Sequence, residues 1–370
     1  MAKDHPTPTG PIAPDLRILE TRVYRGPNVW SYAPAIHLVV DLGVLEGYPS
    51  DSIDGFTDAL VALLPGLQRH TCSVGHAGGF IERLEDGTWL GHVAEHVALE
   101  LQSTAGHDLR RGKTRMVKGR PGVYNVIFGY VDETVGIAAG ELAVRLINHL
   151  VQPTDGFDFT EQLDAFLRRA DRVAFGPSTA AIIEEAVSRD IPWLRLNSAS
   201  LVQLGQGVHA QRIRATMTSR TGALAVDIAS DKDLTGKLLS AAGLPTPKQQ
   251  AVRTRRGVLD AARQIGFPVV VKPLDGNHGR GVCLDLQTLD EVDKAYDIAQ
   301  EQSRSGVLIV ESFVTGRDYR CLIVGGRMQA IAERVPAHVV GDGEHTVKEL
   351  VDITNSDPRR GVGHEKVLTR

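Results

Sequence analysis

The sequence has little cysteine and no long hydrophobic run, and each shortage argues against a class of protein. Three cysteines, Cys72, Cys283 and Cys321, occur among the 370 residues. They are widely spaced and odd in number, so a disulfide framework is not expected and a reducing cytoplasm fits the composition. No apolar stretch approaches the ~18–20 residues of a membrane span. The Pro- and Thr-rich residues 1–15 lack the features of a signal peptide, and we expect a disordered tail there.

A strong excess of one charge is also missing. Lysine and arginine number 41, and aspartate and glutamate number 45, which gives a net charge of −4. This balance lacks the basic footprint of a nucleic-acid-binding protein, and we expect neither a nucleic acid nor a membrane as a partner. Hydrophobic residues make up 42% and charged residues 23% of the chain, as in ordinary globular proteins. The length predicts two or three domains.

Strand-like and helical segments alternate along the chain, which predicts an α/β fold. The segment QPTDGFD, at 152–158, carries Pro, Gly and Asp and marks a boundary after a first module of α+β type. The predicted division is a tail (1–15), a first module (16–153), a helical bridge (154–200) and a second module (201–370). Because neither a helix cap nor a polar tail follows the final residues EKVLTR, we expect a fragment of a longer protein.

The expected elements follow the periodicity of the apolar residues. In the first module the predicted strands cover 16–24, 35–43, 113–119 and 123–131, and the predicted helices cover 55–64, 88–106 and 134–151. In the second module the predicted strands cover 248–253, 268–273, 281–286 and 307–314, and the predicted helices cover 231–242, 257–266 and 289–302.

One lysine stands between a buried-looking strand and a glycine-rich loop. The stretch VVVKPLDGNHGRGV places Lys272 at the end of the strand and Gly276, Gly279 and Gly281 in the loop. An ammonium group beside a loop that can wrap a ligand suggests phosphate binding. The common phosphate loop GxxxxGK[ST] is absent, however, and a lone lysine after a strand is more often structural.

Further residues at regular distances favour a nucleotide site. Lys232 opens a helix 40 residues before Lys272 and offers a second ammonium group. The strand LIVE ends at Glu311, and Asp318 lies seven residues later. An adenine needs a flat apolar slot, a ribose needs a carboxylate, and phosphates need cations; these segments offer all three. The alternatives are a solvated helix start for Lys232 and a surface strand end for Glu311.

A second group of polar residues lies in the first module. His92, Glu95 and His96 match H-x-x-E-H, a zinc-hydrolase motif. On a helix the two histidines lie about 40° apart and away from the main apolar stripe. Two imidazoles one turn apart can share a zinc ion, while the glutamate deprotonates the bound water. The alternative is a solvated helix face that carries two histidines by chance.

A zinc site needs a third ligand, for which Glu141 is the candidate. It belongs to the helix predicted at 134–151 and faces away from the apolar stripe of that helix. An i,i+4 pair with Arg145 is the alternative role for this glutamate. His70, Cys72 and His76 lack a fourth partner at the spacing of a zinc site, so we do not count them as ligands. The basic turn at 110–113 either contacts acidic groups of a ligand or is simply solvated.

The chain resembles the cyanophycin synthetase family, and residues 231–335 resemble the first half of an ATP-grasp domain. The matching segments are NVWSYAPAIHLVVDLG, GHVAEHVALELQ, VDIASDKDLTGKLLSAAGLPTP, VVVKPLDGNHGRGV and VESFVTGRDYRCLIVGG. The resemblance implies an ATP-dependent carbon–nitrogen ligase that adds aspartate to the backbone of a polymer through an acyl-phosphate. A later Mur-ligase-like domain adds arginine in full-length members. Residues 201–370 would then be an ATP-grasp domain that is incomplete at its C-terminus.

The resemblance also implies roles for individual residues. Those implied to bind ATP are Lys232, Lys272, Gly276, His278, Gly279, Gly281, Glu311, Phe313, Val314 and Asp318. Within this set the lysines hold phosphates, the glycine-rich loop closes over them, Glu311 and the 313–314 backbone hold adenine, and Asp318 holds ribose. Arg280 and Arg320 are implied to contact an acyl-phosphate or a substrate carboxylate, where positive charge stabilises developing phosphate charge.

The chain departs from the family pattern in its metal site. Family members bind magnesium through an acidic residue and a late Glu-x-Asn pair, and no such pair follows Asp318. We therefore expect the magnesium ligands beyond Arg370, and no turnover by this chain alone. The resemblance implies that the first module binds the cyanophycin polymer or a primer, that some members cleave polymer there, and that the protein is a homo-oligomer. A zinc-dependent hydrolase and an inactive polymer-binding fragment are the alternative functions.

Overall fold

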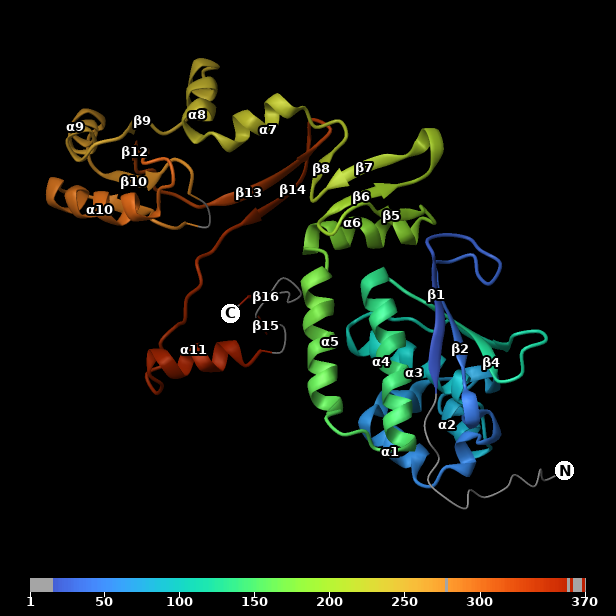
Figure 1. Cartoon of the computed structure of the whole chain (residues 1–370). Coiled ribbons are helices and arrows are strands. Elements are labelled where there is room, and N and C mark those ends of the chain that lie inside the picture. The colour runs from blue at the N-terminus through green and yellow to red at the C-terminus, as the bar shows by residue number, and fades with distance from the viewer. Residues whose placement is uncertain (1–15, 277–278, 358–359, 362–367, 370) are drawn as a thin grey trace. The chain divides into compact units, whose positions relative to one another are not determined.

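The computed structural model describes residues 16–276, 279–357, 360–361 and 368–369. The chain divides into two compact units, Met1–Thr216 and Met217–Arg370 (Figure 1). Each unit combines helices with mostly antiparallel sheets, which confirms the predicted mixed α/β class. The finer division of the chain into four segments stays a prediction.

The first unit is built from helices and strands that alternate along the chain. In order they are β1 (Arg17–Tyr24), β2 (Ala35–Asp41), α1 (Phe56–Leu63), α2 (Gly79–Glu85), α3 (Leu90–Thr104), β3 (Gly112–Met116), β4 (Val123–Gly129), α4 (Glu133–Val151), α5 (Phe159–Val173), α6 (Pro177–Ser188), β5 (Trp193–Arg195), β6 (Leu201–Leu204) and β7 (Gln211–Arg214). Short 3-10 helices add η1 (Gly43–Gly47), η2 (Ser50–Ser52), η3 (Pro65–Arg69), η4 (Cys72–Val74) and η5 (Gly207–His209).

The main sheet of the first unit has the strand order β1-β2-β4-β3 and is antiparallel throughout. The helices α3 and α4 pack on each other and on this sheet. Residues Ala35–Val40 of β2 are all buried, because the strand is central in the sheet. The core contains the apolar residues of α3, so packing anchors this helix in the first unit.

The helix α4 is the one element in the described part of the chain that is long and apolar enough to cross a membrane, judged by length and composition alone. Half of its apolar window is buried inside the fold. It contacts α3, α5 and the sheet. Core helices of folded domains have this same profile.

The second unit contains a four-stranded antiparallel sheet with the order β11-β10-β12-β9. The elements of this unit are β8 (Met217–Thr218), α7 (Ala223–Ser230), α8 (Lys232–Ala241), β9 (Gln249–Val252), α9 (Arg255–Ile265), β10 (Val269–Pro273), β11 (Cys283–Leu286), α10 (Leu289–Gln302), β12 (Leu308–Ser312), β13 (Tyr319–Val324), β14 (Arg327–Glu333), α11 (Val347–Asn355), β15 (Arg360–Gly361) and β16 (Leu368–Thr369). The helices α9 and α10 pack on the sheet and on each other.

The periodicity located the long elements well. The helix predicted at 289–302 is α10, residue for residue, and each of the other elements given a range in advance is present with slightly different ends. The sequence did not indicate α2, α7, α11 or the 3-10 helices. The β5 strand pairs with β6, and β6 with β7, so one small sheet crosses the boundary predicted between residues 200 and 201.

Candidate functional site

The two central strands of the second unit bring together two residues of the predicted nucleotide site. β10 pairs antiparallel with β12, and Val270 lies opposite Glu311. Lys272, two positions from Val270, therefore lies on the same face of the sheet as Glu311. Its Nζ is 2.6 Å from Glu311 Oε1, and the two side chains are only 21% and 14% exposed. The sequence assigned these residues to different parts of a nucleotide, whereas the structure shows them as an ion pair.

Lys232 lies beside the same strand end. Asp231 caps α8 by accepting hydrogen bonds from the backbone amides of Asp233 and Leu234, and this starts the helix at Lys232. The Lys232 ammonium group donates to the carbonyl oxygens of Gly276, at 2.5 Å, and Pro273, at 3.3 Å. Burial, and then the charge of Lys272, lower the pKa of Lys232. An anion between the two ammonium groups would offset this repulsion, so the site fits a phosphate.

The glycine-rich loop starts from a fixed anchor. Asp275 accepts hydrogen bonds from the backbone amides of Ser305, at 2.8 Å, and Arg304, at 3.3 Å. Gly281 has a φ of +66°, and a Cβ there would lie 2.9 Å from the Cβ of Gln302, so both conformation and space require glycine. Gly276 is half-buried, whereas Gly279 is exposed at φ +74°.

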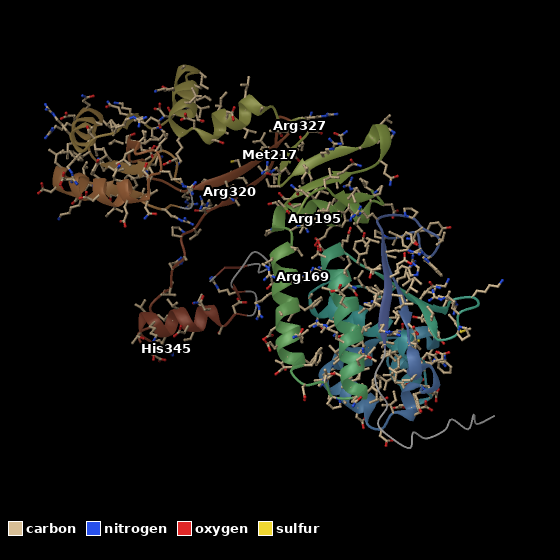
Figure 2. The ribbon with its side chains drawn as sticks, viewed as in Figure 1. Arg169, Arg195, Met217, Arg320, Arg327 and His345 are labelled. Carbon is tan, nitrogen blue, oxygen red and sulfur yellow. The ribbon has the colours of Figure 1, made fainter. Side chains whose placement is uncertain are left out.

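Three predicted loop or pocket residues are exposed or lie outside the described structure. His278 lies outside the described residues. Arg280 is exposed, and Arg320 projects from the exposed strand β13, where Figure 2 labels it. In the described part of the chain, neither arginine side chain forms a hydrogen bond or ion pair with another predicted site residue.

The residues predicted to hold adenine and ribose follow β12. The Phe313 amide donates to the carbonyl oxygen of Pro268 at 3.0 Å, so Phe313 has only its carbonyl to offer a base. Val314 is 67% exposed. Asp318 is exposed and lies 3.5 Å from Nη1 of Arg334. A ribose would therefore have to compete with a weak surface ion pair for this carboxylate.

The first unit contains a cavity of about 1000 Å³ beside α3. Polar side chains of α3 line one wall, including His92, Glu95, His96 and Glu100. Basic side chains line it as well: Arg69, Arg83, Arg110, Lys113 and Arg115. The alternative of a solvated helix face is therefore wrong for His92 and His96, because the polar side of α3 faces a cavity and His96 is only 6% exposed.

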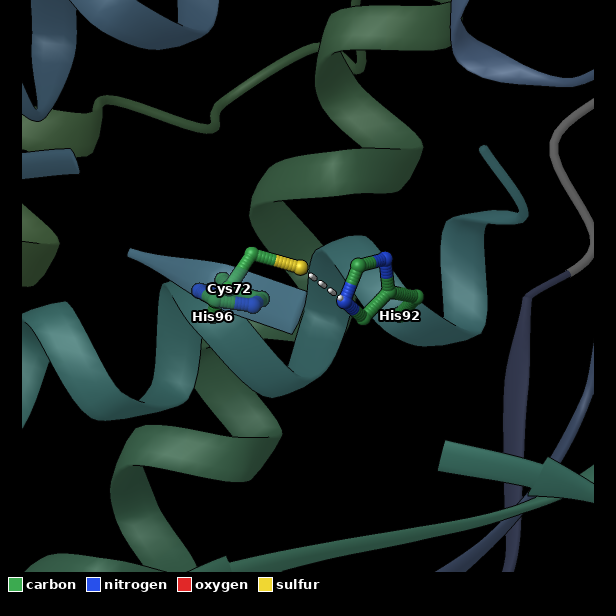
Figure 3. A group of neighbouring side chains, drawn as sticks. All are labelled: Cys72, His92 and His96. Carbon is green, nitrogen blue, oxygen red and sulfur yellow. Dashed lines mark hydrogen bonds between the residues drawn. The ribbon is translucent and has the colours of Figure 1, made fainter. Parts of the chain in front are cut away.

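A possible metal-binding group is present in this cavity, but it differs from the predicted one. The ligand atoms of Cys72, His92 and His96 lie within 4.8 Å of one another, and Cys72 Sγ is 3.4 Å from His92 Nε2 (Figure 3). It is the one such group among the described residues. Glu141 is exposed on α4 and is not a member. The structure therefore brings Cys72, whose spacing had argued against a ligand role, to the position for which Glu141 was predicted.

Sequence spacing gave no signal for Cys72, because it precedes His92 by 20 residues. This spacing is longer than that between paired ligands of common structural zinc sites. Cys72 has a φ of +49°, in the left-handed region that non-glycine residues rarely adopt. Such backbone strain occurs preferentially at functional sites.

Burial sets the protonation of the polar residues on α3. It lowers the pKa of His92 to about 4 and, with the charges of His92 and His70, that of His96 to about 2. Both imidazoles are therefore neutral at pH 7, as metal ligation requires. Burial also raises the pKa of Glu95 to about 7, although a hydrogen bond from Thr114 Oγ1, 2.5 Å away, lowers it. Glu95 is thus able to accept or donate a proton near neutral pH.

Two family models match the chain. Residues 37–152 match the cyanophycin synthase-like N-terminal domain, and residues 237–324 match the ATP-grasp domain. The two family models therefore define a protein in which an ATP-grasp domain follows a cyanophycin synthase-like domain. An ATP-grasp domain implies ATP and, in general, Mg²⁺.

The relatives agree with this class. Cyanophycin synthetases from Crocosphaera subtropica and Synechocystis sp. are each 46% identical to the chain over 361 residues, which is 96% of this chain and 41% of each relative. The predicted resemblance to the cyanophycin synthetases is thus confirmed over almost the whole chain, which spans about two fifths of the length of these relatives.

More distant similarity reaches enzymes of glutathione biosynthesis. A bifunctional glutathione biosynthesis protein from Listeria innocua is 32% identical over 227 residues, 60% of this chain and 29% of that protein. The crystal structure of a bifunctional glutathione synthetase from Pasteurella multocida superposes with a TM-score of 0.37 at 16% identity, covering 89% of this chain and 64% of that one.

Proposed function

We propose that the chain acts in cyanophycin synthesis as an ATP-dependent ligase that adds aspartate to the polymer backbone through an acyl-phosphate. The observation that carries this proposal is the 44–46% identity to cyanophycin synthetases across 96% of the chain. The proposal includes a cyanophycin primer and aspartate as substrates, a homo-oligomeric state and a cytoplasmic location.

Residues of the second unit would contact ATP. ATP would supply the phosphoryl group that activates a carboxylate. Lys232 and Lys272 would hold its phosphates, since their ammonium groups already repel each other beside the glycine-rich loop. Lys272 would exchange part of its contact with Glu311 for a phosphate oxygen. Glu311 and Val314 would then orient the adenine, and Asp318 the ribose.

The test is ATP-dependent incorporation of labelled aspartate into a cyanophycin primer, measured with ADP release on the full gene product. We expect Lys272→Ala to abolish incorporation. It should also weaken ATP binding by about 1.5–3 kcal/mol, the usual value of a hydrogen bond to a charged group. The control is Lys237→Ala on α8. It also removes an ammonium group, but the Lys237 side chain is 68% exposed and pairs with Asp233. Equal activity of Lys272→Ala and wild type would refute the phosphate role.

The first unit favours a second candidate function, a zinc-dependent hydrolase that cleaves the polymer. The observation behind it is the Cys72–His92–His96 group inside the cavity. Thiolate sulfur and neutral imidazole nitrogen are both common zinc ligands, and three protein ligands leave one position open. Bound zinc would lower the pKa of a water molecule. Glu95 would take up a proton, and basic residues such as Arg110 and Lys113 would contact carboxylates of the polymer.

Metal analysis and a cleavage assay without ATP test this second function. His96→Ala is expected to lose both zinc and cleavage. Glu95→Gln is expected to keep zinc and lose cleavage, because it removes the proton acceptor and spares the ligands. Protein that remains free of zinc after incubation with the ion would refute the metal site. Polymer binding with neither ligase nor hydrolase activity would instead identify an inactive binding fragment.

A further inference from the structure

Behind the Cys72–His92–His96 group lies a chain of hydrogen bonds that ends in a buried carboxylate. His96 Nδ1 is 2.9 Å from His70 Nδ1, and His70 Nε2 is 2.9 Å from Glu100 Oε2. The side chains of His70 and Glu100 are 14% and 7% exposed. Neither His70 nor Glu100 is one of the three possible ligands, so direct metal binding does not account for these hydrogen bonds.

The hydrogen bonds have one consistent direction when Glu100 is ionised and His70 carries a single ring proton. An ionised carboxylate only accepts, so the proton between Glu100 and His70 must belong to His70 Nε2. His70 then has a lone pair on Nδ1. The facing Nδ1 atom of His96 must therefore carry a hydrogen and donate it. In this tautomer His96 keeps its Nε2 lone pair for a metal ion.

The surrounding residues hold this series of hydrogen bonds in place. A Cβ at Gly66 would lie 1.6 Å from Glu100 Oε1, so the carboxylate occupies the space that a side chain at position 66 would fill. The ring of Phe80 stacks on His96 with 3.9 Å between ring centroids and an interplanar angle of 15°. His92 is also held through Nδ1, which lies 2.9 Å from Thr88 Oγ1. Both ligand rings thus leave Nε2 for the metal.

We propose that His70 and Glu100 are positioning residues that hold His96 as the Nδ1–H tautomer, so that its Nε2 binds zinc together with Cys72 and His92. This inference rests on the zinc site proposed as the second function. Outer hydrogen-bond acceptors of metal-bound histidines fix the ring orientation and increase the basicity of the ligating nitrogen. His70 would orient His96 directly, and Glu100 would orient His70.

Two readouts on the full chain test the proposal. The first is NMR of the metal-free protein labelled with ¹⁵N-histidine, in which ring couplings identify the protonated nitrogen of His96. We expect Nδ1–H in wild type. We expect a changed tautomer in Glu100→Gln, because an amide can donate to His70 Nε2. The second readout is cobalt(II) affinity, measured by competition with a chelator, with the thiolate-to-cobalt absorption recorded at saturation.

Glu100→Gln and Gly66→Ala are expected to weaken cobalt binding by about 10- to 100-fold while keeping the thiolate absorption, since the three ligands are unchanged. Gly66→Ala displaces the Glu100 carboxylate but leaves the hydrogen-bonding groups of His96, His70 and Glu100 chemically unchanged. The matched control is Glu82→Gln, which changes the exposed partner of His76 and should leave the affinity at the wild-type value.

The outcomes separate this inference from the function on which it rests. A His96 Nε2–H tautomer in wild type would overturn the inference, as would unchanged cobalt affinity in both Glu100→Gln and Gly66→Ala. Absence of cobalt binding by wild type would refute the zinc site, while the tautomer measured in the metal-free protein would still decide the role of His70 and Glu100. If Glu100→Gln does not fold, Gly66→Ala and the wild-type tautomer decide it.

Discussion

Lys272 and Glu311 form an ion pair between the two central strands of the second unit, with Nζ and Oε1 2.6 Å apart. Because both side chains are mostly buried, each charge depends on the other for its stabilisation. A nucleotide that draws Lys272 to a phosphate must therefore also satisfy Glu311. The pair links the phosphate end of the proposed site to its adenine end.

The stability of the second unit should show this dependence. Lys272→Met leaves Glu311 buried without a partner and is expected to lower the free energy of unfolding by about 3–5 kcal/mol. The double variant Lys272→Met/Glu311→Gln should recover much of the loss, because no unpaired charge remains. Urea unfolding measures both. Lys237→Met, which breaks an exposed ion pair, should cost under about 1 kcal/mol. Additive losses in the double variant would contradict the coupling.

Glu95 should make the stability of the first unit depend on pH. Its pKa of about 7 in the folded protein lies above the ordinary value of 4.5. The folded protein therefore keeps a proton that the unfolded chain releases between these pH values, and stability is lost as the pH rises from about 4.5 to about 7. Glu95→Gln stays neutral, so it should be more stable than wild type by up to about 3 kcal/mol above pH 7.

Urea unfolding at pH 5 and pH 8 checks the Glu95 prediction. The advantage of Glu95→Gln should be much smaller at pH 5, where wild-type Glu95 is largely protonated in the folded state. Glu82→Gln, at an exposed position on α2, should show no such change. An advantage that is the same at both pH values would show that burial does not perturb this carboxyl.

The identity of the third ligand can be decided by two substitutions. Cys72→Ala should abolish stoichiometric zinc binding, because it removes one of three donors within 4.8 Å. Glu141→Ala should leave zinc binding unchanged, since Glu141 is exposed on α4 outside this group. Elemental analysis after dialysis against zinc measures both. Zinc loss in Glu141→Ala with retention in Cys72→Ala would restore the prediction made from the sequence.

Asp132 should be more important for the first unit than an ordinary helix cap. Its side chain caps α4 and also lies 2.6 Å from Nη1 of Arg195, which packs on the ring of Phe175 (Figure 2 labels Arg195). Asp132→Ala should cost about 3–5 kcal/mol, because a mostly buried arginine loses its carboxylate partner and keeps the carbonyl oxygens of Val173 and Ala199. Asp158→Ala removes only the cap of α5 and should cost about 1 kcal/mol. Thermal unfolding compares the two, and equal losses would exclude a contribution from the ion pair.

The sequence by itself determined the elements and the positions of the key side chains along them. Helices such as α10 and strands such as β10 were predictable because apolar spacing and caps act over a few residues. The motif around His92 and the position of Lys272 were equally local, since each needs only its neighbours on one helix or at one strand end.

Only the tertiary structure decided which distant residues meet. Cys72 reaches His92 across 20 residues, Glu100 fits against Gly66, and Lys272 pairs with Glu311 across 39 residues. Glu141 remains exposed although its helix contacts the helix of the histidines. These outcomes depend on how the helices and strands pack and on which glycine leaves space for a carboxylate. Periodicity carries no information on either, because it describes one element at a time.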